Sequence, residues 1–102
     1  MNKIKMHLNK EPFREIESGR KRFEVRLFDE KRQALAVGDV IEFVLRPDCV
    51  ESFEKKVVGL HQYETFTDFY AEHPEEKGEV TAYDFYTKED EAEYGVVAIE
   101  LA

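Results

Sequence analysis

The stretch Ser-Gly-Arg-Lys-Arg-Phe-Glu-Val-Arg-Leu-Phe-Asp-Glu-Lys-Arg, residues 18–32, carries the most specific pattern of the chain. Gly19 is typical of the residue that ends a helix. From residue 21 to residue 28, apolar and charged residues alternate, which predicts a strand with two unlike faces. The apolar face holds Phe23, Val25 and Leu27. The opposite face holds Arg22, Glu24 and Arg26. The pattern therefore predicts a strand that presents charge from one side.

Four further strands are predicted around this one. Pro12 is typical of the start of a short helix, which Gly19 ends. The turn Val37-Gly38-Asp39 precedes the most apolar strand, and a change of phase at Gly59 predicts a bulge or bend in the longest one. The predicted strands cover residues 4–8, 21–28, 40–45, 52–63 and 96–101.

Helices are predicted in the second half of the chain by capping patterns. A threonine is followed three residues later by an acidic residue in Thr65–Asp68, Thr81–Asp84 and Thr87–Asp90, as at helix N-termini. These patterns predict a helix over residues 66–72 and helical turns between residues 80 and 94, ended by Gly95. Residues 29–33 read as a polar connection with one helical turn.

The fold class that follows is α+β: a small β-barrel of about five strands, closed on itself, with short flanking helices. The helices do not alternate strictly with the strands, which argues against a doubly wound parallel sheet. A length of 102 residues favours a single domain over residues 1–102. The expected core consists of Phe23, Val25, Leu27, Val40, Ile41, Phe43, Val57, Val97 and Ile99.

Composition limits the class of protein. No apolar run approaches the roughly 18 residues of a membrane span, and no apolar stretch follows the first basic residues, so neither a membrane partner nor secretion is expected. The single Cys49 forms no internal disulfide, and a cytoplasmic location is expected. The three histidines lie far apart and no glycine-rich phosphate loop is present, so neither a metal nor a cofactor is expected.

Charge is divided unevenly along the chain. The net charge is −8, yet residues 14–32 hold seven basic and five acidic residues. Residues 64–93, the acidic segment, hold eleven acidic residues and only two lysines. One interpretation is a solvated acidic surface. The other is a small positive cleft in a negative body, which admits a small anionic or nucleotide-like ligand and rejects long duplex DNA.

The central stretch resembles the signature of the ASCH domain, a member of the PUA-like superfamily. The resemblance lies in Gly19-Arg20-Lys21-Arg22-Phe23-Glu24-Val25-Arg26, where glycine, lysine, glutamate and arginine are spaced as in that family. It continues in residues 37–43 and 94–101, so it covers essentially the whole chain. It implies a PUA-like β-barrel with a cleft beside this strand, and a function related to RNA or nucleotides.

The first functional hypothesis is a binding module for RNA or a small nucleoside-like ligand. Glu24 and Arg26 lie two apart on a strand and so share a face, and Arg26 can offer a planar fork to a phosphate or base edge. A base can stack on a tyrosine at the cleft. The candidate ligand-binding residues are Lys21, Glu24, Arg26, Lys31, Arg32, Tyr86 and Tyr94.

Two other classes of function stay open. Some bacterial ASCH proteins are amidohydrolases that remove the acetyl group of N(4)-acetylcytidine, and Lys21 matches their catalytic lysine. Glu24 stands where their threonine nucleophile would be, so an enzyme would use Glu24 as a general base on water, with Lys21 polarising the carbonyl. The resemblance also implies a later glutamate, for which the candidates are Glu72, Glu75, Glu76 and Glu79. The third hypothesis is an interaction protein that binds a basic partner through the acidic segment.

Overall fold

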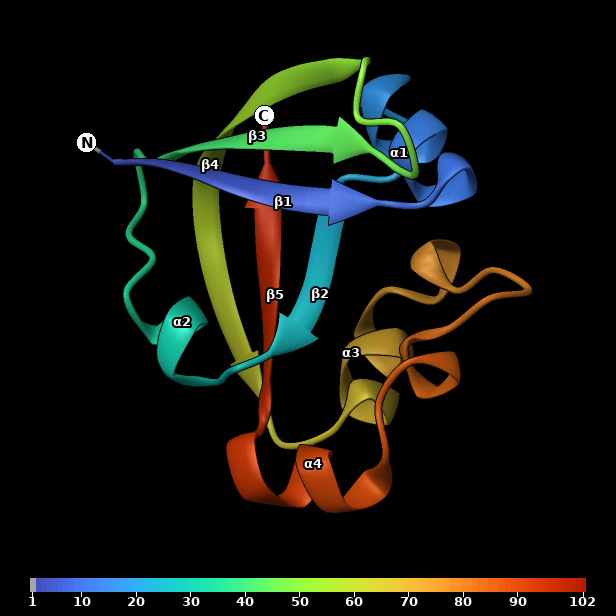
Figure 1. Ribbon diagram of the computed structural model, residues 1–102. Helices are drawn as coiled ribbons and strands as arrows, with labels where there is room; N and C mark the ends of the chain where they lie inside the picture. Colours follow the sequence, from blue (N-terminus) through green and yellow to red (C-terminus); the bar gives the residue numbers. More distant parts are fainter. Residues whose placement is uncertain (1) are drawn as a thin grey trace.

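A single curled sheet organises the computed structural model, which describes residues 2–102 (Figure 1). Its strands are β1 (Lys3–Leu8), β2 (Phe23–Leu27), β3 (Val40–Leu45), β4 (Ser52–Tyr63) and β5 (Val96–Leu101). The helices are α1 (Lys10–Glu17), α2 (Glu30–Gln33), α3 (Phe66–Glu72) and α4 (Lys88–Tyr94), with 3₁₀ turns at Pro74–Glu76 and Ala82–Asp84. The α+β class and all five predicted strands are confirmed, with β2 shorter at both ends than the alternation predicted.

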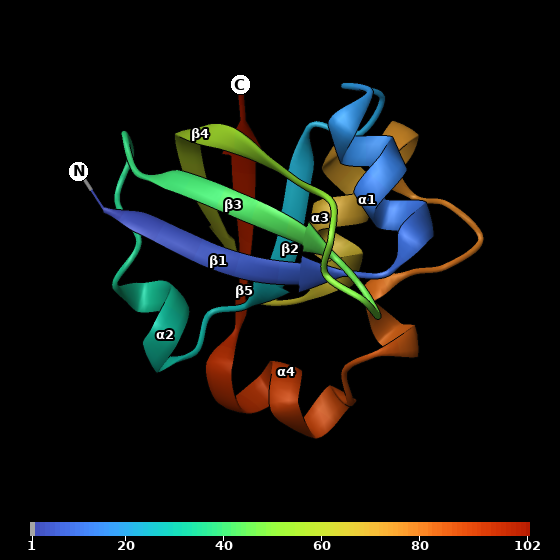
Figure 2. The same cartoon turned by 45° about the horizontal axis from the view of Figure 1, so that its top comes forward.

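The sheet curls because β4 pairs with two different strands along its length. Its first half pairs with β3 and its second half with β5, and the register shifts between Val57 and Gly59. This confirms the predicted irregularity, and a Cβ atom at Gly59 would lie 2.6 Å from Oε1 of Glu100. Figure 2 shows the result, with β1 and β3 crossing in front of β5.

The barrel is open, where the sequence predicted closure. The strand order is β1-β3-β4-β5-β2, with β1 parallel to β3 and every other pair antiparallel. The edge strands β1 and β2 do not pair with each other within residues 2–102. The inward face of β2 carries Glu24 and Arg26, and both residues line the cavity at this free edge.

The core of the half-barrel is formed by strand residues and by α1, whose Phe13 and Ile16 are fully buried. Of the nine residues predicted for the core, seven are buried. Val25 and Val40 are only partly buried. Val40 opens β3 beside the turn at Gly38, and Val25 lies on the free edge strand, so neither is covered on all sides.

The acidic segment forms a second layer against the outward face of β2 and β5. Phe66 and Phe69 of α3 are fully buried there, packed on Val96 and on Phe23 with Ala98. Thr65 and Thr87 accept hydrogen bonds from the backbone N–H of Asp68 and Asp90, which confirms the capping patterns. No helix in the described part of the chain is long and apolar enough to span a membrane.

Candidate functional site

Both faces of β2 are buried, which the charged alternation did not predict. Glu24 pairs in register with Ile99, and Arg26 pairs with Val97. Residues paired across antiparallel strands share a face. Since Val97 and Ile99 belong to the interior core, the charged face of β2 points toward the interior of the half-barrel. Only 6% of Glu24 is exposed, so this face is not a solvated surface.

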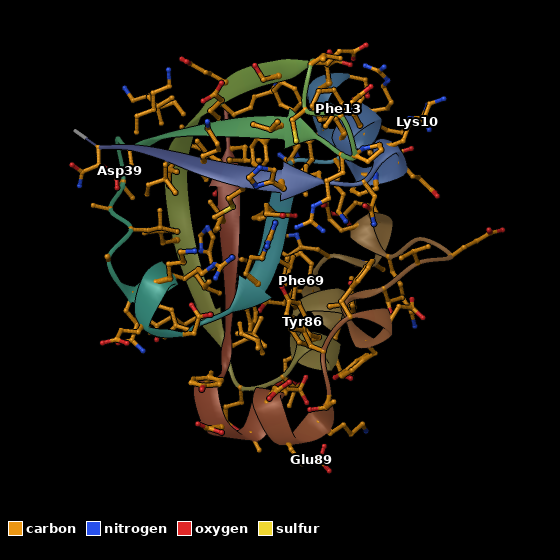
Figure 3. The ribbon with its side chains drawn as sticks, viewed as in Figure 1. Lys10, Phe13, Asp39, Phe69, Tyr86 and Glu89 are labelled. Carbon is orange, nitrogen blue, oxygen red and sulfur yellow. The ribbon has the colours of Figure 1, made fainter. Side chains whose placement is uncertain are left out.

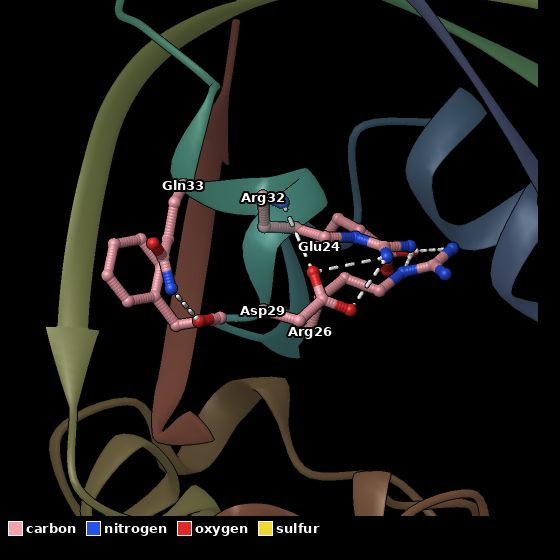
Figure 4. A network of polar contacts seen from close by, with 6 residues as sticks. Glu24, Arg26, Asp29, Arg32 and Gln33 are labelled. Atoms are coloured by element: carbon pink, nitrogen blue, oxygen red, sulfur yellow. Dashed lines mark hydrogen bonds and ion pairs between the residues drawn. The ribbon is translucent and has the colours of Figure 1, made fainter. Parts of the chain in front are cut away.

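Glu24 and Arg26 form a buried ion pair (Figure 4). Nε of Arg26 donates to Oε2 of Glu24 at 2.8 Å, and Nη2 lies 2.8 Å from the same oxygen. Burial lowers the pKa of Arg26, but the charge of Glu24 and the hydroxyl of Tyr86 outweigh it, so the pKa is raised. The Nε–Nη2 edge of the guanidinium is thus engaged by Glu24 and is not free for a phosphate.

A cavity of about 390 Å³ runs along the free edge of β2 toward the end of β1. We call it the seam cavity, because it lies between the edge strands β1 and β2, which do not pair with each other within the described residues. Its lining comes from β1, α1, β2, the residue after β3, and the acidic segment. The basic residues of the lining are Arg20, Lys21, Arg26, Arg46 and Lys77. The acidic residues are Glu11, Glu15, Glu24, Glu75 and Glu76.

The seam cavity is therefore balanced in charge, rather than the cationic cleft that the count over residues 14–32 predicted. The count of charges over residues 14–32 did not include the carboxylates that α1 and the acidic segment contribute to the lining of the same cavity. Arg26 is paired with Glu24, and Arg20 with Glu15 at 3.1 Å. Lys21 and Arg46 form no ion pair with any residue from 2 to 102, so they remain available to a ligand.

Glu76 brings a second buried carboxylate to the seam cavity. It ends the 3₁₀ turn Pro74–Glu76, and 6% of it is exposed. Its Oε2 accepts a hydrogen bond from the backbone N–H of Arg22 at 3.2 Å. Its Oε1 is buried and has no hydrogen-bond partner among the described residues. A buried polar atom without a hydrogen-bond partner lowers the stability of the fold by roughly 1–3 kcal/mol, so a donor to this oxygen would be stabilising.

Aromatic side chains of the acidic segment form one wall of the seam cavity, and Figure 3 labels one of them, Tyr86. Tyr86 stacks on Phe66, with ring centroids 5.6 Å apart and planes at 12°. Tyr70 accepts a hydrogen bond from the backbone N–H of Ala82, and burial raises the pKa of its hydroxyl. Phe85 also lines the cavity and is 61% exposed, so a face of its ring is open to a ligand.

Comparison with known proteins places the chain in a family. The family model described as ASCH domain matches residues 6–102. This protein belongs to the ASCH domain family. The chain is similar over 97% of its length to the hypothetical protein PH0355, with 33% identity, a TM-score of 0.80 and coverage of 96% of that chain. It is also similar to protein PF0455 from Pyrococcus furiosus, with 31% identity, a TM-score of 0.72 and coverage of 97% and 94%. No curated protein matches.

The ASCH family assignment confirms the resemblance carried by residues 19–26, and its five-stranded half-barrel is consistent with a small PUA-like barrel. The family is PUA-like and is suggested to bind RNA. Of the residues that the sequence singled out, Lys21, Glu24, Arg26 and Tyr86 line the seam cavity of this ASCH domain.

The remaining candidates lie elsewhere. Lys31 is exposed on α2. Arg32 is held by Asp29, which accepts both its backbone N–H at 3.1 Å and its Nη1 at 3.2 Å (Figure 4). Tyr94 is 41% exposed at the end of α4 and does not line the cavity. Neither Lys31 nor Arg32 of this helical turn lines the seam cavity, an outcome that strand spacing alone does not reveal.

The glutamate candidates separate in the same way. Glu75 and Glu76 line the seam cavity, whereas Glu72 and Glu79 do not. Sequence reasoning missed Arg46 and Phe85 as cavity residues. The parallel pairing of β1 with β3 places Arg46 beside Leu8, whose carbonyl accepts the Arg46 N–H. Phe85 is 61% exposed, which its apolar ring alone does not predict.

The chemistry that the site allows is recognition of a planar polar ligand. Carboxylate oxygens of Glu24 and Glu76 accept hydrogen bonds, the ammonium of Lys21 donates them, and Phe85 offers a stacking face. No group of three or more histidine, cysteine or acidic side chains suited to hold a metal ion occurs within residues 2–102.

Proposed function

We propose that this ASCH domain binds one nucleoside or nucleotide unit, free or unpaired within RNA, in the seam cavity. The main support for the proposal is that a wall with hydrogen-bonding groups and a wall with aromatic groups line the same cavity. One wall offers Lys21 and Glu24 as hydrogen-bonding groups, and the other offers Tyr86 and Phe85 as aromatic ones. Proteins recognise an unpaired base by stacking on its faces and hydrogen bonding to its edge.

Cavity size and charge support a small ligand. A volume of about 390 Å³ falls within the range of small-molecule sites. Long nucleic acids are bound through many phosphate contacts with basic residues, and their affinity depends on a positive surface. The lining of the seam cavity is balanced in charge and the whole chain carries −8, so a long duplex is disfavoured.

Calorimetric titration with nucleosides, nucleoside monophosphates, a short single-stranded RNA and a duplex tests this proposal. We expect saturable binding of a nucleoside, nucleotide or single strand, and no binding of the duplex at the same concentration. Lys21→Ala is expected to weaken binding at least tenfold. Lys31→Ala removes a lysine that lies outside the cavity and serves as the matched control. Absence of heat with every ligand, or equal weakening by both variants, would overturn the proposal.

A second candidate function is hydrolysis of N(4)-acetylcytidine. It is favoured by one observation: Lys21, Glu24 and two later glutamates, Glu75 and Glu76, line the same cavity. In this reaction Glu24 takes a proton from water, and the resulting hydroxide attacks the acetyl carbon. Lys21 stabilises the oxyanion. The tetrahedral intermediate then expels the cytidine nitrogen, which is protonated, and releases acetate.

Chromatography of N(4)-acetylcytidine incubated with the protein separates the two candidates. Binding alone predicts that the substrate stays intact. Hydrolysis predicts acetate and cytidine, with a rate that falls about 100-fold in Glu24→Gln, because that variant removes the general base. Glu24→Thr places a hydroxyl beside Lys21 and tests whether this cavity supports the threonine chemistry of the amidohydrolases.

A further inference from the structure

Four buried carboxylates can be compared within residues 2–102. Asp39 is fully engaged: its two oxygens accept the backbone N–H groups of Asn2 and Ala36, each at 3.0 Å. Glu91 accepts the Phe66 N–H and the Tyr83 hydroxyl, both at 2.7 Å. Glu24 is paired with Arg26. Glu76 alone keeps a buried oxygen without a donor, and it lines the seam cavity.

We infer that the ligand of the seam cavity donates an N–H to Oε1 of Glu76, so that the site selects a base with an exocyclic amino group over its keto counterpart. The inference rests on the proposed function, since it assigns a chemical class to the ligand of that same cavity. Buried polar groups in folded proteins are almost always paired. An unpaired acceptor in the wall of a cavity therefore indicates a donor on the molecule that fills it.

The geometry of Glu76 permits this contact. Oε2 is fixed by the N–H of Arg22, while the last torsion of a glutamate has a broad minimum. Oε1 is itself covered, so the contact requires the carboxyl group to rotate about this torsion until Oε1 meets a ligand in the cavity. Glu24 adds to the effect, because only its Oε2 is bonded to Arg26. Two carboxylates thus offer acceptors to the same ligand.

Replacement of the amino group by a keto oxygen removes the amino donor and places the N–H on the neighbouring ring nitrogen instead. A keto oxygen is an acceptor and makes no hydrogen bond with an ionised carboxylate. Sites built to bond a substrate N–H discriminate strongly against an analogue that lacks it, because the buried partner is then left unpaired. Lys21 is the competing group, since its ammonium would favour a keto oxygen. The preference between amino and keto bases therefore shows whether Glu76 or Lys21 forms the hydrogen bond to the edge of the base.

Calorimetric titration with cytidine against uridine, and with adenosine against inosine, tests the inference. Within each pair the amino group is exchanged for a keto oxygen and the neighbouring ring nitrogen changes from an acceptor to an N–H donor, so an amino preference shows that Glu76 meets the amino group rather than the ring N–H. We expect the amino member of the pair that binds to have at least tenfold lower Kd. Glu76→Gln keeps an oxygen for the Arg22 N–H but adds an amide donor, so it should bring the two Kd values to within about threefold. Glu79→Gln alters an exposed glutamate outside the cavity and should keep the preference.

The outcomes separate this inference from the proposed function. Equal binding of both members, or tighter binding of the keto member, by the unsubstituted protein overturns the selection while nucleoside binding stands. An amino preference that persists in folded Glu76→Gln overturns the assignment to Glu76. Absence of binding by all four nucleosides overturns the inference together with binding of a free nucleoside. The comparison in the unsubstituted protein needs no variant, so it holds even if Glu76→Gln fails to fold.

Discussion

Glu91 and Glu76 are two carboxylates of the acidic segment that are buried to the same degree, with 6% of each exposed. Glu91 joins α4 to α3 by accepting the N–H of Phe66 and the hydroxyl of Tyr83. Glu76 accepts one backbone N–H and keeps its other oxygen buried without a donor from the described chain, in a residue that lines the seam cavity. The difference teaches that burial of an acid does not by itself mark a site. Whether a buried carboxylate stabilises the fold or binds a ligand depends on whether its oxygens already accept hydrogen bonds from the protein.

The largest effect on stability is expected from Glu91→Ala. The substitution removes two hydrogen bonds to a buried carboxylate and leaves the Phe66 N–H and the Tyr83 hydroxyl without their acceptor. We expect the free energy of unfolding to fall by about 3 kcal/mol, measured by urea denaturation. Ligand affinity of the folded protein should not change. Glu89→Ala, on the exposed side of α4, is the matched control, and an equal loss there would contradict this role of Glu91.

An intermediate effect is expected from Glu24→Ala. It leaves the Arg26 guanidinium buried without its partner, and breaking a buried pair in this way is costly. Water in the seam cavity solvates part of the charge, so we expect a loss of about 2 kcal/mol, below the range for fully enclosed pairs. Unlike Glu91→Ala, this variant should also weaken nucleoside binding. Normal affinity at reduced stability would assign Glu24 to the fold alone.

A small effect on stability is expected from Glu76→Ala. The variant loses the acceptor for the Arg22 N–H but also removes the unpaired oxygen, and the two contributions largely offset each other. We expect a change of about 1 kcal/mol or less in the free energy of unfolding, together with a loss of binding of at least tenfold. A loss of stability as large as that of Glu91→Ala would remove the distinction between the two carboxylates.

A small effect that depends on pH is expected from Asp39→Asn: it is present at neutral pH and disappears in acid. Hydrogen bonds from the backbone of Asn2 and Ala36 lower the pKa of Asp39 below its ordinary value of 3.8. A carboxyl group with a lowered pKa stabilises the fold above the unfolded pKa, and that contribution is lost as the pH falls through the folded pKa. Stability should therefore fall below about pH 4, less steeply in Asp39→Asn. Identical pH profiles from pH 5 to pH 2 would contradict this.

Local patterns account for most of the fold that the sequence predicted. The alternation in β2, the phase change at Gly59 and the threonine caps of α3 and α4 each act over a few residues, so a single sequence displays them. The open barrel was not predicted, because closure depends on whether β1 and β2 meet across the whole molecule.

The seam cavity was predicted only where it coincides with β2. Lys21 and Glu24 were found because the motif marks them, and Tyr86 because a tyrosine near a cleft can stack on a base. Arg46 and Glu76 come from distant segments. The parallel pairing of β1 with β3 brings in Arg46, and the packing of the acidic segment on β2 brings in Glu76. Contacts over such sequence distances leave no periodic signal in the chain.

The central claim is that the seam cavity is the ligand site, and a nuclear magnetic resonance titration tests it most directly. Backbone amide shifts of the ¹⁵N-labelled protein are followed while cytidine or adenosine is added to saturation. The account predicts that the largest changes fall on residues 20–26, on Arg46 and on residues 75–86, with little change along α4. Changes confined to the acidic surface of α4, or spectra that stay the same at millimolar nucleoside, would contradict it.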